Sequence, residues 1–356
     1  MTRRSWNPQR RVIVALVVAT LGLAALATPI ESQSPEAQAN TYFANLLKLG
    51  MPGVAGAVAV TGKIVFSGAA GIADRNTGAP VTPATIFNIG SVSKVLTATA
   101  LMQLIERGKV RIDDPIQKYV TAFPNKGAPI TIKHLVTHTS GIRHYLNETT
   151  RSQTRFSFEQ SLALFKDDPL LFAPGRFYFY SSYGVNLLQG VIENVSGLPF
   201  EEYMRRNVWQ PAGMTNTRLD IPERPVPDRA KAYLMSAGGR EAWANDLSYA
   251  YAAGGMLSTA EDLVRFGVAL NHARLVNRGS LARMYETPLD PVMRYEEGGA
   301  PSRMDFQQGF IWRIRLGPGG RRYLHHPGSV NGFNAHGFQC APRHLSGRRC
   351  SRVDSL

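Results

Sequence analysis

The residues best suited to covalent chemistry form an S-x-x-K motif, with Ser91 and Lys94 in the first turn of a helix predicted from residue 91 to about residue 107. Residues three apart share one face of a helix, so the hydroxyl and the amine can meet. A serine needs a neighbouring base, and a lysine serves as that base only where burial or positive charge lowers its pKa. The helix N-terminus adds free backbone N–H groups near a developing oxyanion. The motif predicts a nucleophilic serine, and a helix-capping serine followed by a surface lysine is the alternative.

A second candidate lies in a Y-S-S motif, with Tyr180 and Ser182 just before a helix predicted from residue 183 to residue 195. A phenolate held near a lysine can take the serine proton and later deliver it to the leaving group, while the hydroxyl of Ser182 binds substrate. The alternative is a partly buried phenol beside a helix cap.

The third candidate is an H-P-G-S segment, His326 to Ser329, which closes a predicted strand that begins near residue 322. Gly328 on an edge strand would let a substrate backbone approach closely, and the N–H of Ser329 would pair with that of Ser91 as an oxyanion hole. A Pro-Gly-Ser loop that merely ends a strand is the alternative. Because the three motifs each fall at a break between predicted elements, they together predict one acyl-transfer site.

The predicted secondary structure places two β-rich ends around a helical middle. Strands are predicted near both ends, at residues 54–60, 63–69, 310–316 and 322–325. Helices are predicted at residues 35–49, 91–107, 132–137, 158–165, 183–195, 199–208 and 260–271. The pattern predicts an α/β fold of the α+β type, with an antiparallel sheet from about 50–70 and 305–333, flanked by helices, and a mostly helical region over about 100–290.

Composition excludes several classes of protein. The chain has 356 residues, 44% of them apolar and 19% charged, which allows a large core. The formal net charge is +14, but four arginines lie in the first eleven residues and the remaining basic residues are scattered among acids. Without a basic stripe interleaved with aromatic residues, nucleic-acid binding is not expected. A mildly basic surface favours contact with anionic polymers of the cell envelope.

The N-terminus has the layout of an export signal. An arginine-rich start precedes an apolar run over 12–27, which ends in an A-x-A pattern at Ala25 and Ala27. We expect residues 1–27 to be a cleaved signal peptide and residues 28–34 to be a linker. The product would then be periplasmic or secreted, with no stable membrane span after cleavage.

Six segments between about residues 41 and 333 carry a family resemblance: FNIGSVSK, IKHLVTHTSGI, FAPGRFYFYSSYG, PAGMTNT, AAGGMLSTAEDLVRF and HPGSVNGF. In this order they resemble the serine β-lactamase and penicillin-binding-protein superfamily. The similarity is greatest to its class C-like branch of β-lactamases, D-alanyl-D-alanine carboxypeptidases, D-aminopeptidases and esterases. The resemblance implies a β-lactamase/transpeptidase-like fold with the site between the sheet and the helical region. It also implies an acyl-enzyme mechanism without a metal or a cofactor.

Residue by residue, the resemblance implies that Ser91 is the nucleophile and that Lys94 and Tyr180 are the base and the acid. The backbone N–H groups of Ser91 and Ser329 would form the oxyanion hole. His138 falls in an H-T-S-G segment that matches a structural turn of the family. We therefore expect His138 to stay outside the site.

Two departures from the family pattern bear on the substrate. The chain has Ser182 where the family often has Asn, and His326-Pro327-Gly328 where it often has Lys-Thr-Gly. Proline offers no hydroxyl to hold a substrate carboxylate, and histidine is only partly charged near neutral pH. We therefore expect a serine hydrolase of small amides or esters rather than an efficient β-lactamase, with a small-molecule or peptide substrate for which the cell wall is one source. The alternative is a catalytically inactive penicillin-binding-like protein that binds cell-wall peptides, or a truncated product.

The last residues differ in composition from the rest of the chain. Residues 334–356 are arginine-rich, show no strand alternation in this interpretation, and contain both cysteines, Cys340 and Cys350. We expect the hydrolase domain to cover residues 35–333 and the tail to be a frameshifted or truncated end that leaves a sheet edge exposed. A native tail closed by a disulfide between the two cysteines is the alternative. Neither a disulfide framework nor a cysteine metal site is expected in the body of the chain.

Overall fold

A computed structural model describes residues 34–146, 149, 151–234, 238–243, 245–287, 293–317, 320, 322–330 and 332–340. The predicted signal peptide, the first six residues of the predicted linker and residues 341–356 of the predicted tail lie outside these residues.

The first part of the domain is a β-hairpin covered by one helix. Thr61 and Gly62 both have positive φ, 51° and 84°, as the two central residues of a tight hairpin turn require. The adjacent helix packs the ring of Phe43 6.0 Å from that of Phe66. The predicted hairpin is confirmed, although its second strand extends beyond residue 69. These elements are β1 (Gly53–Val60), β2 (Lys63–Asp74), the short β3 (Ala79–Pro80) and helix α1 (Pro35–Lys48).

The last part of the described chain forms a four-stranded antiparallel sheet in the order β12-β11-β10-β9. Its strands are β9 (Gln307–Gln308), β10 (Arg313–Leu316), β11 (Arg322–Val330) and β12 (Phe333–Cys340). Strand β10 pairs with β11 only as far as His325, whereas β12 pairs with β11 from Tyr323 to Val330. Beyond His325, therefore, β11 is paired on its β12 side and, among the described residues, not on its β10 side.

Two expectations about this sheet are wrong. The H-P-G-S segment does not close the strand but lies inside β11, because β12 continues to pair with it, as at Gly328 with Ala335. The expectation that no strand follows residue 333 also fails, since residues 334–340 belong to β12. Small residues conceal this strand in the sequence, but they allow it to lie close to the nucleophile segment: a methyl group on Gly337 would lie 3.7 Å from Val92 Cγ1.

A small third sheet in the order β4-β8-β5 leads the chain to Ser91. Its strands are β4 (Phe87–Asn88), β5 (Arg218–Leu219) and β8 (Met256–Ser258), and a separate pair is β6 (Tyr233–Leu234) and β7 (Arg240–Glu241). After β4 comes the 3₁₀ turn η1 (Gly90–Val92), followed at once by helix α2 (Ser93–Glu106). The serine motif therefore spans a sheet end and a helix start.

Helix α2 is the central element of the core. Every residue from Ser93 to Leu104 is buried, which is possible because small and β-branched residues alternate with leucines and methionine around its surface. The same buried cluster includes Leu188 on helix α6 (Ser182–Ser196), and Ile314 and Leu324 in the four-stranded sheet. One core therefore joins the helical region to the sheet.

The other helices of the described residues mostly agree with the sequence pattern. Those predicted at 132–137, 158–165, 183–195 and 260–271 are confirmed, whereas the helix predicted at 199–208 is divided by a π-helical turn. They are η2 (Ile116–Lys118), α3 (Ile132–Val136), α5 (Phe158–Ala163), α6 (Ser182–Ser196), α7 (Phe200–Met204), the π turn η3 (Arg205–Trp209), α8 (Gln210–Ala212), η5 (Ser248–Ala250), α9 (Tyr251–Gly254), α10 (Ala260–Asn271) and α11 (Arg278–Met284).

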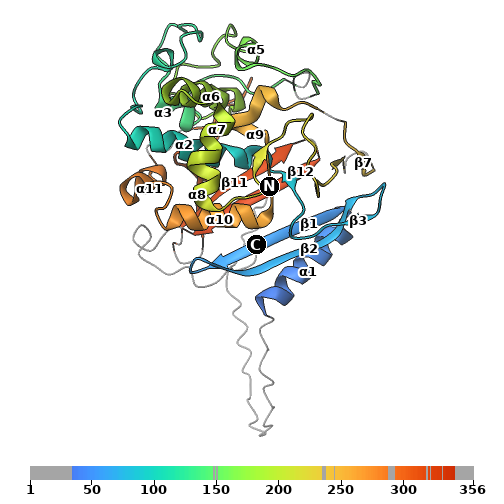
Figure 1. Ribbon diagram of the computed structural model, residues 1–356. Coiled ribbons are helices and arrows are strands. Elements are labelled where there is room, and N and C mark those ends of the chain that lie inside the picture. Colours follow the sequence, from blue (N-terminus) through green and yellow to red (C-terminus); the bar gives the residue numbers. More distant parts are fainter. Residues whose placement is uncertain are drawn as a thin grey trace, which may run out of the picture.

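The layers can be followed in Figure 1. Helices α3, α5 and α6 lie at one end, strands β11 and β12 in the middle, and the hairpin β1–β2 with α1 at the other end. Helix α10 contacts β1, β2 and β12, so it joins the hairpin to the large sheet. None of the described helices combines the length and the apolar character that crossing a membrane requires.

Replacing a core leucine of α2 should destabilise the whole domain. Leu96 is fully buried, so Leu96→Ala should lower the free energy of unfolding by about 3 kcal/mol through lost burial and the cavity left behind. Urea denaturation followed by circular dichroism measures the change. Leu49→Ala, at a side chain that is 77% exposed, is the matched control and should have little effect. Equal effects of the two variants would contradict this description of the core.

Candidate active site

The hydroxyl of Ser91 lies against a buried amine. Lys94 is fully buried, and its Nζ donates hydrogen bonds to Ser91 Oγ at 2.9 Å and to the backbone oxygen of Ala253 at 2.5 Å. Burial lowers the pKa of Lys94 well below its ordinary value, and the nearby charge of Arg313 lowers it further. Ser91 therefore has beside it an amine whose environment favours the neutral, proton-accepting form.

Tyr180 is the third member of this group. Lys94 Nζ lies 4.9 Å from the centre of the Tyr180 ring, and the hydroxyls of Ser91 and Ser182 lie close enough to the phenol to lower its pKa. Burial raises the pKa of Tyr180 well above its ordinary value, while the nearby hydroxyl of Ser91 opposes this shift only in part. The resting phenol is therefore protonated, contrary to the expectation of a phenolate that takes the serine proton.

Ser182 begins helix α6, one residue earlier than predicted, and is buried. Its backbone N–H donates to His144 Nδ1 at 3.1 Å, and its hydroxyl lies close enough to the phenols of Tyr180 and Tyr145 to lower the pKa of each. Ser181 caps the helix by accepting the N–H of Gly184. The hydroxyl of Ser182 therefore lies beside the phenol of Tyr180.

Strand β11 packs against the nucleophile turn through two glycines. A methyl group on Gly328 would lie 2.1 Å from Ile89 O and 3.2 Å from Ser91 N, so only glycine allows this approach. Gly90 has a φ of 49°, and a methyl group there would lie 2.8 Å from Ser329 N. The backbone nitrogens of Ser91 and Ser329 consequently lie in adjoining segments, as an oxyanion hole requires.

His326 is buried at the same site, with its ring centre 6.0 Å from that of Tyr180. Its Nδ1 lies 2.7 Å from the oxygen of Pro327, and its Nε2 has no hydrogen-bond partner among the described residues. Burial, followed by the charges of Lys94 and Arg313, lowers the pKa of His326 well below its ordinary value. The imidazole is therefore neutral, and it offers a substrate no positive charge.

Arg313 is a site residue that the sequence analysis missed. Its guanidinium carbon lies 5.4 Å from the centre of the Tyr180 ring and 4.7 Å from that of Phe306. Strand β10 places it opposite His325, one residue before His326. In the sequence, Arg313 is one arginine of an alternating R-I-R-L strand, and nothing local distinguishes it from its exposed neighbour Arg315.

His138 lies closer to the chemistry than expected. Its φ of 57° agrees with the predicted turn, but its buried ring also packs 4.6 Å from that of Tyr180. Its Nδ1 accepts the N–H of Ser181 at 3.3 Å, and its carbonyl accepts that of Phe179 at 2.8 Å. His138 therefore contacts the site through the ring of Tyr180. The expectation that it stays outside the site is corrected to this extent.

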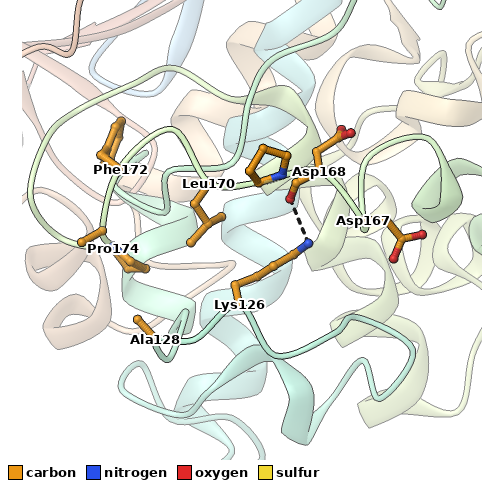
Figure 2. Close-up of a pocket in the computed structure, with 9 residues that line it drawn as sticks. Lys126, Ala128, Asp167, Asp168, Leu170, Phe172 and Pro174 are labelled. Atoms are coloured by element: carbon orange, nitrogen blue, oxygen red, sulfur yellow. Dashed lines mark hydrogen bonds between the residues drawn. The ribbon is translucent and has the colours of Figure 1, made fainter.

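A surface cavity of about 550 Å³ lies away from these residues. Figure 2 shows it bordered by Lys126 and by the loop from Asp167 to Pro174, with Lys126 Nζ donating to Asp168 O at 2.9 Å. No predicted site residue lines this cavity. Within the described residues, no group of three or more His, Cys, Asp or Glu side chains could hold a metal ion.

Sequence comparisons place the chain among known proteins. It is 31% identical over 295 residues to the serine β-lactamase-like protein LACTB of Homo sapiens mitochondria, a match that covers 63% of this chain and 54% of that protein. The chain therefore spans about half the length of that relative. It is 30% identical over 292 residues to esterase EstB of Burkholderia gladioli, with 70% of this chain and 72% of that protein covered.

Comparison with solved structures agrees with the fold. A D-amino acid amidase from Ochrobactrum anthropi SV3 superposes with a TM-score of 0.71 at 25% identity, covering 82% of each chain. The sequence model of the Beta-lactamase family matches residues 39–340, which include all three motifs and strand β12. The chain therefore belongs to the Beta-lactamase family of serine hydrolases.

Proposed function

We propose that the protein hydrolyses small esters or amides through an acyl-enzyme on Ser91. The observation that carries this proposal is the buried Lys94 amine, which lies 2.9 Å from Ser91 Oγ with its pKa lowered. A neutral amine at hydrogen-bond distance is what a serine hydroxyl needs to become a nucleophile at neutral pH.

The proton then moves through the two groups next to Ser91. Lys94 takes the hydroxyl proton as Oγ bonds to the substrate carbonyl carbon, and the N–H groups of Ser91 and Ser329 stabilise the resulting oxyanion. Tyr180, protonated at rest, donates its proton to the leaving oxygen or nitrogen as the bond to carbon breaks. The lysine ammonium then returns a proton to the phenolate, which restores both groups. In deacylation a water molecule loses a proton to Lys94, attacks the acyl carbon, and Ser91 Oγ leaves and regains a proton.

The substrate preference follows from the strand beside the nucleophile. His326 is uncharged, and Pro327 has no hydroxyl, so this segment provides a weak anchor for the carboxylate of a β-lactam. Esters and amides that need no such anchor fit the site better. The similarity to an esterase and to a D-amino acid amidase supports esters and amides as substrates. Peptides derived from the cell wall are candidate amide substrates.

We also propose that the protein is exported, on the pattern of residues 1–27. Expression of the full chain in a bacterial host should yield a periplasmic or secreted product that begins after Ala27, as read by intact mass. Full-length protein retained in the cytoplasm would contradict this proposal.

Labelling of the nucleophile tests the activity directly. Intact mass spectrometry after exposure to a fluorophosphonate should show one adduct, and Ser91→Ala should abolish it because, among the described residues, Ser91 is the serine that a buried amine contacts. A parallel sample with a penicillin should label slowly or not at all. Folded wild-type protein that gives no adduct would indicate instead an inactive relative that only binds cell-wall peptides.

Removal of Arg313 should change the pH dependence of acylation. The charge of Arg313 lowers the pKa of Lys94, so Arg313→Gln should raise that pKa and move the rise in activity to higher pH. Rates of ester hydrolysis between pH 5 and pH 10 measure the profile. Arg313→Lys should keep it, and the matched control Arg315→Gln, at an arginine paired with Asp305, should leave it unchanged. A profile of Arg313→Gln identical to wild type would remove Arg313 from the mechanism.

A further inference from the structure

The nucleophile turn is held by a buried amide that no motif singles out. Asn88, the last residue of β4, accepts the backbone N–H of Gly90 with its Oδ1 at 2.8 Å and is only 2% exposed. Gly90 immediately precedes Ser91 and has the positive φ that turns the chain toward Ser329. Fixing the N–H of Gly90 therefore restrains the Ile89–Gly90 peptide, which directly precedes the peptide that carries the N–H of Ser91.

The amide of Asn88 is itself oriented by a buried carboxylate. Its Nδ2 donates to Asp220 Oδ2 at 3.0 Å, and Arg229 holds both oxygens of that carboxylate, at 2.7 and 2.8 Å. An ionised carboxylate only accepts hydrogen bonds, whereas an amide has one accepting and one donating end. Asp220 consequently selects the donating end of Asn88 and leaves the accepting end for Gly90. Without Asp220, the amide is free to rotate and to oppose the N–H of Gly90 with a second donor.

Asp220 is also hydrogen-bonded to the segment whose backbone holds Lys94. The backbone N–H of Asp220 donates to Gly255 O at 2.9 Å, and Gly255 lies two residues after Ala253, whose oxygen accepts Lys94 Nζ. The next residue of that segment, Met256, accepts the backbone N–H of Ile89 at 3.0 Å. Asp220 therefore bonds both to the segment that precedes Ser91, through Asn88, and to the segment that follows Ala253, through Gly255.

We propose that Arg229, Asp220 and Asn88 form a positioning unit that sets the orientation of the Ser91 N–H in the oxyanion hole. This inference rests on the proposed acyl-enzyme function. Donors that stabilise an oxyanion act only when they are fixed in advance, and a small displacement of the reacting groups is costly. If these three residues only tied the end of β4 to the segment after β5, they would stabilise the fold without affecting that alignment.

A pair of matched substrates separates the two roles. An ester and its thionoester differ in the atom that enters the oxyanion hole, and the longer, weakly accepting C=S group gains less from well-placed donors. Asp220→Ala and Asn88→Ala should lower kcat on the ester by about 10- to 100-fold with little change in KM. Both should also reduce the ratio of ester to thionoester kcat/KM. The exchange variant Asn88→Asp with Asp220→Asn restores an acceptor for Gly90 and should recover part of the ratio.

Asp262→Ala is the matched control. Asp262 is fully buried, pairs with Arg265 at 3.0 Å and accepts from Thr217 just before β5, so its loss disturbs the same small sheet away from Gly90. This variant should lower the melting temperature but keep the ester to thionoester ratio. If Asp220→Ala and Asn88→Ala also lose stability with an unchanged ratio, the positioning role is overturned. Asn88→Ala leaves the ion pair of Asp220 intact, so it decides the question if Asp220→Ala does not fold.

A second measurement does not depend on turnover. Hydrogen exchange of the peptide around residues 86–96, read by mass spectrometry on folded protein, should be faster in both positioning variants than in wild type or Asp262→Ala. If the wild type shows neither adduct nor turnover, the proposed function fails while this measurement still tests the unit. Unchanged exchange in Asn88→Ala would show that the amide does not hold the turn and would overturn the inference.

Discussion

A lysine amine kept inside the core is the constraint on which the site depends. Lys94 is fully buried, and among the described residues its Nζ bonds to a hydroxyl and a carbonyl, not to a carboxylate. An ammonium group in that place would lose its hydration without an opposite charge to replace it, so the neutral amine is favoured. In the proposed mechanism, the lone pair that results makes Ser91 a nucleophile. Arg313 favours the same neutral form from the neighbouring strand without touching the serine.

The fold produces this environment by packing the buried helix α2 against the C-terminal end of the short helix α9. Helix α2 is covered by α6 and α9, and β11 packs against the turn η1 just before it, so the first turn of α2 has no access to bulk water on most faces. Ala253 lies in the last turn of α9, where backbone carbonyls lack partners within the helix, and Lys94 Nζ satisfies one of them. The buried amine therefore also completes the hydrogen bonding of a helix end.

Local sequence patterns predicted the parts of the site that carry their own signal. Ser91 and Lys94 share a helix turn, Tyr180 and Ser182 flank a cap, and Gly328 must lack a side chain, so spacing and residue type were informative. Helix α10 was predicted at its observed ends because its apolar face repeats with helical spacing. Together with the family resemblance, these patterns predicted the fold class and the group of residues that the structure brings together.

The missed residues act through contacts that no local pattern records. Arg313 reaches Tyr180 from another strand, and Asp220 reaches Asn88 across 132 positions of the chain. Strand β12 was missed because glycine and alanine weaken its strand signal, although pairing with β11 fixes it. Such residues become apparent only when the elements are placed in space.

The buried titratable groups around Ser91 also make the stability of the fold depend on pH. Lys94 and the histidines His138, His144 and His326 all have lowered pKa values in the folded state, that of His144 reaching about 4 because of its burial. These groups bind protons more readily in the unfolded chain than in the folded one. The free energy of unfolding therefore rises with pH. The histidine contributions to stability are full above about pH 6.5. That of His144 is lost progressively as the pH falls from about 6.5 to about 4. A fall in pH therefore lowers the stability of the fold through the same buried groups that surround Ser91.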